Sequence, residues 1–167
     1  SGLPGSGNTV GDALVTPERV KMVGLTGSSE VGRNLAQKAA GMFKKYSLEL
    51  GGKNPMLVLK DYDVEKAAGL ASFGGYFHQG QICMATSRVV VEEPIYEDFC
   101  QALAGQAKKV PMGDPHSPET IVGPLIHEKQ CALLDELIED AVSKGARLLT
   151  GGKHKGAFYE PTVLADV

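Results

Sequence analysis

The sequence predicts an α/β fold in which a largely parallel sheet is flanked by helices. Short apolar, β-branched stretches alternate with longer stretches whose apolar residues recur every three or four positions. Alternation of this kind is typical of parallel sheets joined by helical connections. Glycine and proline gather between the stretches, where connections are expected. The 167 residues, 43% of them hydrophobic, are enough to bury one substantial core.

Local patterns define the expected elements in order. Asp63 suits the N-cap of a helix, Pro94 suits a first helical turn, and Gly145 suits a helix end. Lys153-His154-Lys155 is interpreted as a solvated turn. The last helix is expected to face inward through Leu133, Leu134, Leu137, Ile138 and Ala141. The expected helices cover 9–14, 29–42, 64–76, 94–110 and 128–144, and the expected strands cover 21–25, 45–50, 55–59, 87–92, 147–150 and 162–165.

Composition excludes several classes of protein. A formal net charge of −3 with 22% charged residues fits neither a disordered tail nor a nucleic-acid-binding protein. No apolar run approaches the ~20 residues of a membrane span. Because Ser1-Gly2-Leu3-Pro4 lacks the basic and apolar regions of a secretory signal, we expect a cytoplasmic location and no membrane partner. Three cysteines without ligand spacing argue against a disulfide framework and against a metal site.

Cys83, in Gly80-Gln81-Ile82-Cys83, is the candidate nucleophile. The preceding stretch, residues 73–80, changes from a helical pattern to glycines, which places the thiol on a connection where functional residues concentrate. A thiolate is a strong nucleophile. The alternative is a buried cysteine that acts as a small hydrophobe. Cys100 and Cys131 fall in helical patterns and are expected to be packed.

Glu49 is the candidate general base. It lies in Leu48-Glu49-Leu50-Gly51-Gly52-Lys53, at the end of an expected strand. Gly51 and Gly52 permit close backbone approach or positive φ angles, so the carboxylate is expected at the mouth of the strand. A positioned carboxylate can activate water as a general base. The alternative is a glutamate that simply points to solvent.

The stretch Thr26-Gly27-Ser28-Ser29-Glu30-Val31-Gly32 joins an expected strand to an expected helix. Backbone N–H groups at such a helix N-terminus can bind phosphate. The alternative is an ordinary helix with Ser28 as its N-cap and a buried face of Val31, Leu35 and Ala39. The local pattern does not match the Rossmann or Walker glycine motifs.

Three ordered segments resemble the motifs of the NAD(P)-dependent aldehyde dehydrogenase family. They are residues 24–33, 48–53 and 80–83. The resemblance extends through Pro111-Met112-Gly113-Asp114-Pro115 and Gly123-Pro124-Leu125-Ile126. Within the family, the segment 78–84 is most similar to enzymes that act on aromatic aldehydes such as benzaldehyde and vanillin.

The resemblance implies a mechanism and a cofactor, NAD or NADP. Cys83 would form a thiohemiacetal with the aldehyde, hydride transfer would leave a thioester, and Glu49 would activate the water that releases the acid. The backbone N–H of the nucleophile would help to bind the oxyanion. The cofactor contacts implied by the family motifs are Gly7, Gly27, Ser28 and Leu50, with Gly7 in a loop over 5–11 near the phosphates.

The resemblance also implies how the chain is organised. Residues 1–50 would be the C-terminal part of a Rossmann-like NAD(P)-binding domain, and residues 51–167 most of the catalytic domain. The upstream oxyanion asparagine, the upstream ribose-binding lysine and the downstream Glu-Ile-Phe-Gly-Pro block of the family are not in this sequence, which we therefore expect to be partial. A homo-oligomer acting on a small-molecule aldehyde is expected for the full-length enzyme. The alternative function is a non-catalytic fragment or interaction module that retains the motifs.

Two further features have competing interpretations. His78 could form a dyad with Cys83, as in a cysteine hydrolase, or could be a favourable charge at a helix end or a wall of the substrate tunnel. Phe73, Tyr76 and Phe77 could line an aromatic pocket, although aromatic residues at this spacing are more often part of a core.

Overall fold

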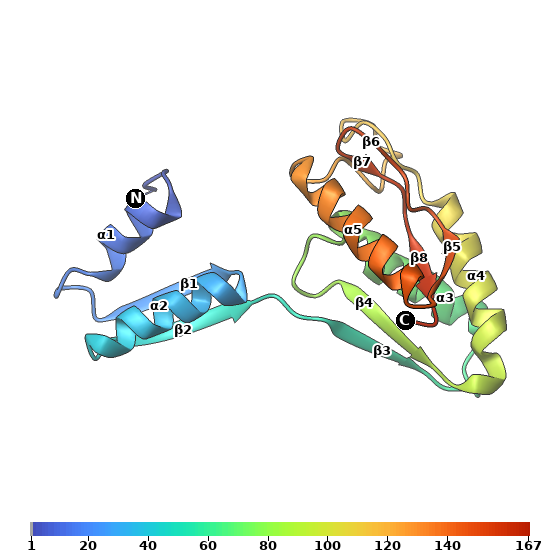
Figure 1. Cartoon of the computed structure of the whole chain (residues 1–167), viewed down its shortest axis with the longest axis horizontal. Coiled ribbons are helices and arrows are strands. Elements are labelled where there is room, and N and C mark those ends of the chain that lie inside the picture. The colour runs from blue at the N-terminus through green and yellow to red at the C-terminus, as the bar shows by residue number, and fades with distance from the viewer. Residues whose placement is uncertain (1) are drawn as a thin grey trace. The chain divides into compact units, whose positions relative to one another are not determined.

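The computed structural model describes residues 2–167, which form two compact units, 2–52 and 53–167. Each unit contains its own pair of parallel strands (Figure 1). The helical segments are a π-helix Gly7–Gly11, α1 Asp12–Val15, α2 Ser29–Gly41, α3 Val64–Tyr76, α4 Tyr96–Lys109, α5 Lys129–Ser143 and 3₁₀ turns Phe77–Gly80 and Glu93–Ile95. The strands are β1 Met22–Gly27, β2 Lys45–Leu50, β3 Asn54–Val58, β4 Thr86–Val91, β5 Arg147–Thr150, β6 His154–Lys155, β7 Phe158–Tyr159 and β8 Val163–Ala165.

The first unit is built on a β1–α2–β2 arrangement. The two strands pair in parallel from Met22 opposite Lys45 to Gly27 opposite Leu50. A small core forms where α2 and the preceding segment meet the sheet, from Val15, Val23 and Ala39. Buried Lys44 donates from Nζ to the carbonyls of Val15 and Pro17, so the start of the second strand is tied to the end of α1 and to the segment that follows it.

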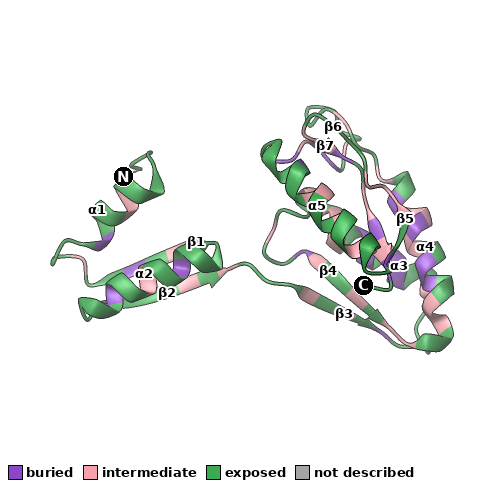
Figure 2. Cartoon of the chain, viewed as in Figure 1, coloured by how far each residue is buried: buried purple, intermediate pink, exposed green. Residues whose placement is uncertain are grey.

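The second unit repeats this arrangement with β3, α3 and β4, and α4 packs against α3. The main core contains Val58, Ala67, Ala68, Ala71 and Phe99. The alanines lie on one face of α3, and this small-residue face allows α4 to approach closely. Buried residues along both helices are purple in Figure 2. The Asp63 side chain accepts a hydrogen bond from the Lys66 N–H at 2.9 Å, which confirms the expected N-cap.

A separate cluster joins α5 to the β6–β7 hairpin. Leu125, Cys131 and Tyr159 are buried together. The Tyr159 hydroxyl donates to the Asp135 carboxylate at 2.6 Å, and burial raises the pKa of this tyrosine. The His154 ring stacks on Tyr159 with centroids 5.4 Å apart. The hairpin is therefore held to the helix by aromatic and polar contacts as well as by apolar packing.

The α/β class is confirmed, and most helices and strands lie close to their expected ranges. The expected parallel pairing is found for β1–β2 and β3–β4, whereas β5–β8 and β6–β7 are antiparallel. The four pairs are separate two-stranded sheets within residues 2–167. The interpretation of Lys153-His154-Lys155 as a turn is wrong in part, because His154 and Lys155 form β6.

Two expected buried faces also need correction. Leu133 and Leu137 on α5 are 46% and 54% exposed, because the helix packs through the neighbouring Cys131, Leu134 and Ile138 instead. The expected position of Val31 in the core is likewise wrong, since this residue is 50% exposed. Along residues 2–167, no helix combines the length and the apolar character that a membrane crossing requires.

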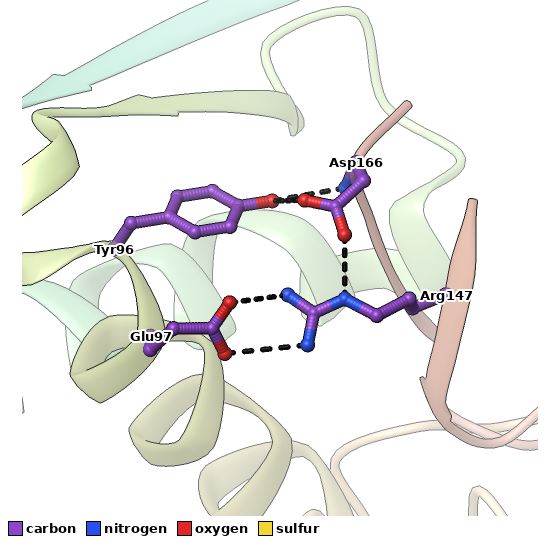
Figure 3. A network of polar contacts seen from close by, with 4 residues as sticks. All are labelled: Tyr96, Glu97, Arg147 and Asp166. Carbon is purple, nitrogen blue, oxygen red and sulfur yellow. Dashed lines mark hydrogen bonds and ion pairs between the residues drawn. The ribbon is translucent and has the colours of Figure 1, made fainter. Parts of the chain in front are cut away.

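Arg147 at the start of β5 joins the C-terminal strand to α4 (Figure 3). Its guanidinium donates two hydrogen bonds to Glu97 and one to Asp166, and the Tyr96 hydroxyl donates to the other Asp166 oxygen at 2.7 Å. The bonds from Tyr96 and Arg147 lower the pKa of Asp166. Asp166 has φ of 60°, a left-handed conformation that Asp and Asn tolerate better than most residues. The network therefore anchors the strand through groups that are still partly exposed.

This network predicts a pH-dependent contribution to stability. Because the pKa of Asp166 is lowered on folding, its contribution is present above the unfolded pKa of about 3.9 and is lost as pH falls through the folded value. We expect Asp166→Asn, which suits the same backbone conformation, to lower the urea midpoint at pH 7. The difference from the unmodified protein should shrink at pH 3. The matched change Asp61→Asn, at an exposed turn position, should give no such pH-dependent difference, and an equal response in both variants would contradict the assignment.

Candidate active site

Cys83 lies on a loop whose backbone is strained where it leaves α3. His78, Gln79 and Gly80 have φ of 52°, 57° and 68°, so three successive residues adopt left-handed conformations. A side chain on Gly80 would place its Cβ 3.0 Å from the Gly75 carbonyl, so glycine suits both the close approach and the conformation. The two non-glycine residues cost about 1–2 kcal/mol each in this region. Such strain persists only where surrounding contacts hold it, and it is concentrated at functional sites.

Side-chain amides supply those contacts. The Gln81 Oε1 accepts from the Ile126 N–H at 3.0 Å. Gln79, in the amide orientation that satisfies both of its groups, accepts from the Gly123 N–H at 2.7 Å and donates to the His78 carbonyl at 2.8 Å. Both glutamines therefore attach the cysteine loop to the segment 123–126.

Cys83 is exposed and not disulfide-bonded, whereas Cys100 and Cys131 are buried. Burial raises the pKa of both the Cys100 and Cys131 thiols, which favours their protonated, unreactive form. The alternative that Cys83 is a core hydrophobe is therefore wrong in this unit, and the expectation that the other two cysteines are packed is confirmed. Of the three thiols, Cys83 is the one that is exposed to solvent.

The aromatic residues before the loop are partly open to solvent. Phe73 and Phe77 are 67% and 43% exposed and stack with centroids 5.3 Å apart, so the core interpretation is wrong for both in this unit. Tyr76 is half-buried and donates its hydroxyl hydrogen bond to the Thr162 carbonyl at 3.0 Å, which ties α3 to the C-terminal segment. Phe73 and Phe77 thus form an aromatic surface on the segment that leads into the cysteine loop.

His78 makes an edge-on contact with Phe77, with ring centroids 4.8 Å apart. Throughout residues 2–167, no hydrogen bond connects the His78 ring to the Cys83 sulfur, and the left-handed backbone lies between the two residues. The local geometry therefore gives no support to a Cys–His dyad.

In the first unit, the other predicted residues gather at the carboxyl end of the parallel pair. Glu49 is exposed and lies opposite Thr26, and Leu50 lies opposite Gly27. The helix α2 begins directly after this edge, with Ser28 as its N-cap. Ligands of open α/β sheets bind outside the carboxyl ends of the strands. The carboxyl end of this strand pair therefore carries Gly27, Glu49 and Leu50, and Ser28 follows it directly. Binding sites are expected at this end of the sheet.

Ser28 is an N-cap, as one of its two interpretations predicts. Its Oγ accepts from the Val31 N–H at 3.2 Å. No acceptor for the Ser29 and Glu30 N–H groups is found within residues 2–167, which leaves two donors of the first turn for a ligand such as phosphate. The cap and the phosphate site are therefore compatible, and the donor groups suit the pyrophosphate of a dinucleotide.

The remaining cofactor candidates have different local structures. Gly7 begins the π-helix, so the loop expected over 5–11 is wrong for residues 7–11. The Leu50 side chain packs on Gly32 of α2, where an added Cβ would meet Leu50 Cδ2 at 2.7 Å. A side chain at position 32 would require the Leu50 side chain to shift, so glycine suits the close helix–strand packing, and this role was not identified from the sequence. Across residues 2–167, no group of three or more His, Cys, Asp or Glu side chains could hold a metal ion.

Asn54 was also missed by sequence analysis. Its Nδ2 donates to the carbonyls of Cys83 and Ala85, at 2.5 and 3.1 Å. Asn54 directly follows Gly51-Gly52-Lys53, and this position was the one signal in the sequence that it could lie near the site. Its hydrogen-bond partners could not be recognised because they are far away in sequence. A hollow between α3 and α4, with Glu65, Asp98 and Lys109 among its lining residues, involves none of the residues that hold the cysteine loop.

Comparisons with known proteins identify the family of this chain. A model of the aldehyde dehydrogenase family matches residues 1–167. The chain is 42% identical over 165 residues to a benzaldehyde dehydrogenase (NAD⁺) of Pseudomonas putida, covering 99% of this chain and 34% of that protein. It is 41% identical over 167 residues to a vanillin dehydrogenase of Pseudomonas fluorescens, covering 100% and 35%. A lactaldehyde dehydrogenase of Methanocaldococcus jannaschii is 40% identical over 162 residues, covering 97% and 35%.

Solved structures give the same result. A betaine aldehyde dehydrogenase of Staphylococcus aureus in complex with NAD⁺ matches with a TM-score of 0.92 and 36% identity, covering 98% of this chain and 34% of that one. The E194S mutant of an aldehyde dehydrogenase from Bacillus cereus matches with a TM-score of 0.93 and 38% identity, covering 99% and 34%. The chain spans about a third of the length of these relatives. With the family model matched over residues 1–167, the chain belongs to the aldehyde dehydrogenase family.

Proposed function

We propose that this chain provides the catalytic thiol and the general base of an enzyme that oxidises an aldehyde to its carboxylic acid with a nicotinamide dinucleotide. The observation that carries the proposal is Cys83, an exposed thiol on a strained and braced loop. The relatives named as aldehyde dehydrogenases support it. We also propose that the full-length enzyme is a homo-oligomer, which rests on the family resemblance, and that it is cytoplasmic, which rests on the expectation from the sequence.

The thiolate of Cys83 would attack the carbonyl carbon and form a C–S bond, which gives a tetrahedral thiohemiacetal with a negatively charged oxygen. Among residues 2–167, no acceptor is hydrogen-bonded to the Cys83 N–H, so this group is free to donate to the oxyanion. A bound nicotinamide would supply the acceptor for the hydride that leaves the same carbon. The carbon is thereby oxidised, and a thioester remains on Cys83.

Glu49 would complete the reaction as a general base. Its carboxylate would take a proton from water as the water oxygen attacks the thioester carbon, and the C–S bond then breaks to release the acid and the thiolate. The exposed position of Glu49 at the end of β2 suits a residue that must reach water. Each turnover consumes one aldehyde, one water and one oxidised cofactor.

For the cofactor, we propose that the first turn of α2 holds the pyrophosphate, with the open N–H groups of Ser29 and Glu30 as donors. Gly27, Ser28 and Leu50 lie at the same edge and would line this site, and Gly7 would approach it. NAD is favoured over NADP because the benzaldehyde dehydrogenase relative is named for NAD⁺ and the betaine aldehyde dehydrogenase structure contains it.

For the substrate, we propose an aromatic aldehyde. The exposed Phe73 and Phe77 rings offer an aromatic surface beside the loop, and benzaldehyde and vanillin dehydrogenases are among the relatives. Other relatives are named for lactaldehyde and betaine aldehyde, so an aliphatic aldehyde is the competing substrate class. The second candidate function, a non-catalytic module that retains the motifs, predicts no saturable NAD binding.

Cys83→Ala tests the nucleophile. We expect turnover of benzaldehyde to fall by at least about 1,000-fold, because removal of a covalent nucleophile abolishes the main route. Of the three thiols in this sequence, iodoacetamide should label only the exposed Cys83 in the native protein, and this label should be absent from Cys83→Ala. The matched change Cys100→Ala removes a buried thiol and should leave labelling unchanged. Undiminished labelling of Cys83→Ala would refute the assignment.

Glu49→Gln separates the two halves of the reaction. The first turnover should still produce a burst of reduced nicotinamide, while steady-state turnover should fall about 100- to 10,000-fold because the thioester is no longer hydrolysed efficiently. Rapid-mixing absorbance measures both phases. Glu18→Gln, an exposed glutamate in the same unit, is the control. If Glu49→Gln lowers the burst of reduced nicotinamide and the steady-state turnover rate equally, the general-base role is wrong.

Ser28→Asp separates the cap from the cofactor site. Aspartate retains the N-cap, so thermal stability should be preserved, whereas its charge should repel pyrophosphate and weaken NAD binding at least about tenfold, or ~1.4 kcal/mol. Calorimetry measures the affinity. Asp63→Ser exchanges the cap residue of α3 and should leave NAD affinity unchanged. Tight NAD binding by Ser28→Asp would exclude this helix end as the phosphate site.

A further inference from the structure

We propose that Asn54 is a positioning residue for Cys83, acting through the backbone of the cysteine turn. This inference rests on the proposed function, in which Cys83 is the nucleophile. The Asn54 amide nitrogen has two hydrogens, and its two acceptors are the carbonyl of Cys83 at 2.5 Å and the carbonyl of Ala85 at 3.1 Å. One side chain thus binds the nucleophile's own peptide group and the peptide group that enters β4.

The sheet cannot make these bonds with backbone groups. Asn54 begins β3 opposite Thr86, but the register then shifts so that Pro55 lies opposite Arg88. Pro55 has no N–H to donate, and the shift leaves one residue of β4 outside the ladder. The carbonyls just before β4 are therefore beyond the reach of regular strand pairing, and the side-chain amide of Asn54 serves in its place.

Packing does not hold the turn either. Cys83 is exposed and Met84 is 72% exposed, whereas Ala85 is 8% exposed and marks the point where the chain enters the unit. On the other side of the nucleophile, the Ala85 N–H donates to the Ile82 carbonyl at 3.0 Å and closes the turn. With hydrogen bonds on both sides of Cys83, its backbone torsions are restrained while the thiol remains accessible.

The hydrogen bond from Asn54 would fix the direction in which the Cys83 thiolate and N–H point. When the Cys83 carbonyl is held, the orientations of its Cα–Cβ bond and of its free N–H are set together. The first directs the thiolate toward the carbonyl carbon, and the second directs the donor toward the oxyanion that forms on the same substrate. A misplacement of about 1 Å can cost about 100-fold in rate. Asn54 would therefore affect turnover without contacting substrate, whereas reagents that need no defined approach would be insensitive to it.

The test compares Asn54→Ala and the isosteric Asn54→Asp, which has no amide hydrogens, in the full protein that carries this sequence. We expect kcat for benzaldehyde to fall at least tenfold in both variants, with KM within threefold of the unmodified protein. Alkylation of Cys83 by iodoacetamide should stay within threefold, because this small reagent needs no oriented attack. Asn54→Ser, with one hydroxyl donor, should recover part of kcat. Gln101→Ala removes an exposed amide on α4 and should change neither quantity.

The outcomes are distinct. Unchanged kcat in Asn54→Ala would overturn the positioning role, and so would a parallel loss of alkylation and turnover in the volume-preserving Asn54→Asp, which would indicate a general structural effect. If Asn54→Ala does not fold, Asn54→Asp decides between these results. Failure of the proposed function appears elsewhere, as full turnover in Cys83→Ala, so the two inferences can be rejected separately.

Discussion

The candidate site of the second unit depends on how the backbone between α3 and β4 is held. Three successive left-handed residues, two of which carry side chains, reverse the chain and present Cys83 on an exposed turn. Such conformations are stable only where surrounding contacts compensate for their cost. Here the compensation comes from the amides of Gln79, Gln81 and Asn54 rather than from apolar burial. A hydrogen-bonded loop can leave its thiol open, whereas a loop held by burial would have enclosed it.

The two units use the same βαβ arrangement for different purposes. In the first, α2 packs on the strand pair through Gly32 and Leu50, and both Ser28 and Glu49 lie at the carboxyl end of that pair. In the second, the helix is followed by the cysteine turn before the parallel strand begins. The core alanines of α3 allow α4 to approach, and this packing makes a rigid support for the strained loop.

Local patterns predicted those elements whose formation depends on neighbouring residues. The range of α3 follows from its Asp63 cap and its alanine face, and β2 follows from an apolar alternation that ends at glycines. The β6–β7 hairpin could not be recognised in the same way, because two-residue strands have no periodicity. Leu133 and Leu137 match an amphipathic helix, yet the elements that pack on α5 select a different stripe.

The sequence by itself determined the α/β class, the positions of most helices and strands, and the candidate roles of Cys83 and Glu49, because residue type, caps and motif spacing are local properties. The tertiary structure alone decided how the strands of residues 2–167 form four separate pairs and which side chains brace the cysteine turn. The contact of Asn54 with the Cys83 carbonyl joins residues 29 positions apart. The hydrogen bond forms because the folded chain brings the donor and the acceptor close together, and no periodicity or local preference in the sequence predicts this contact.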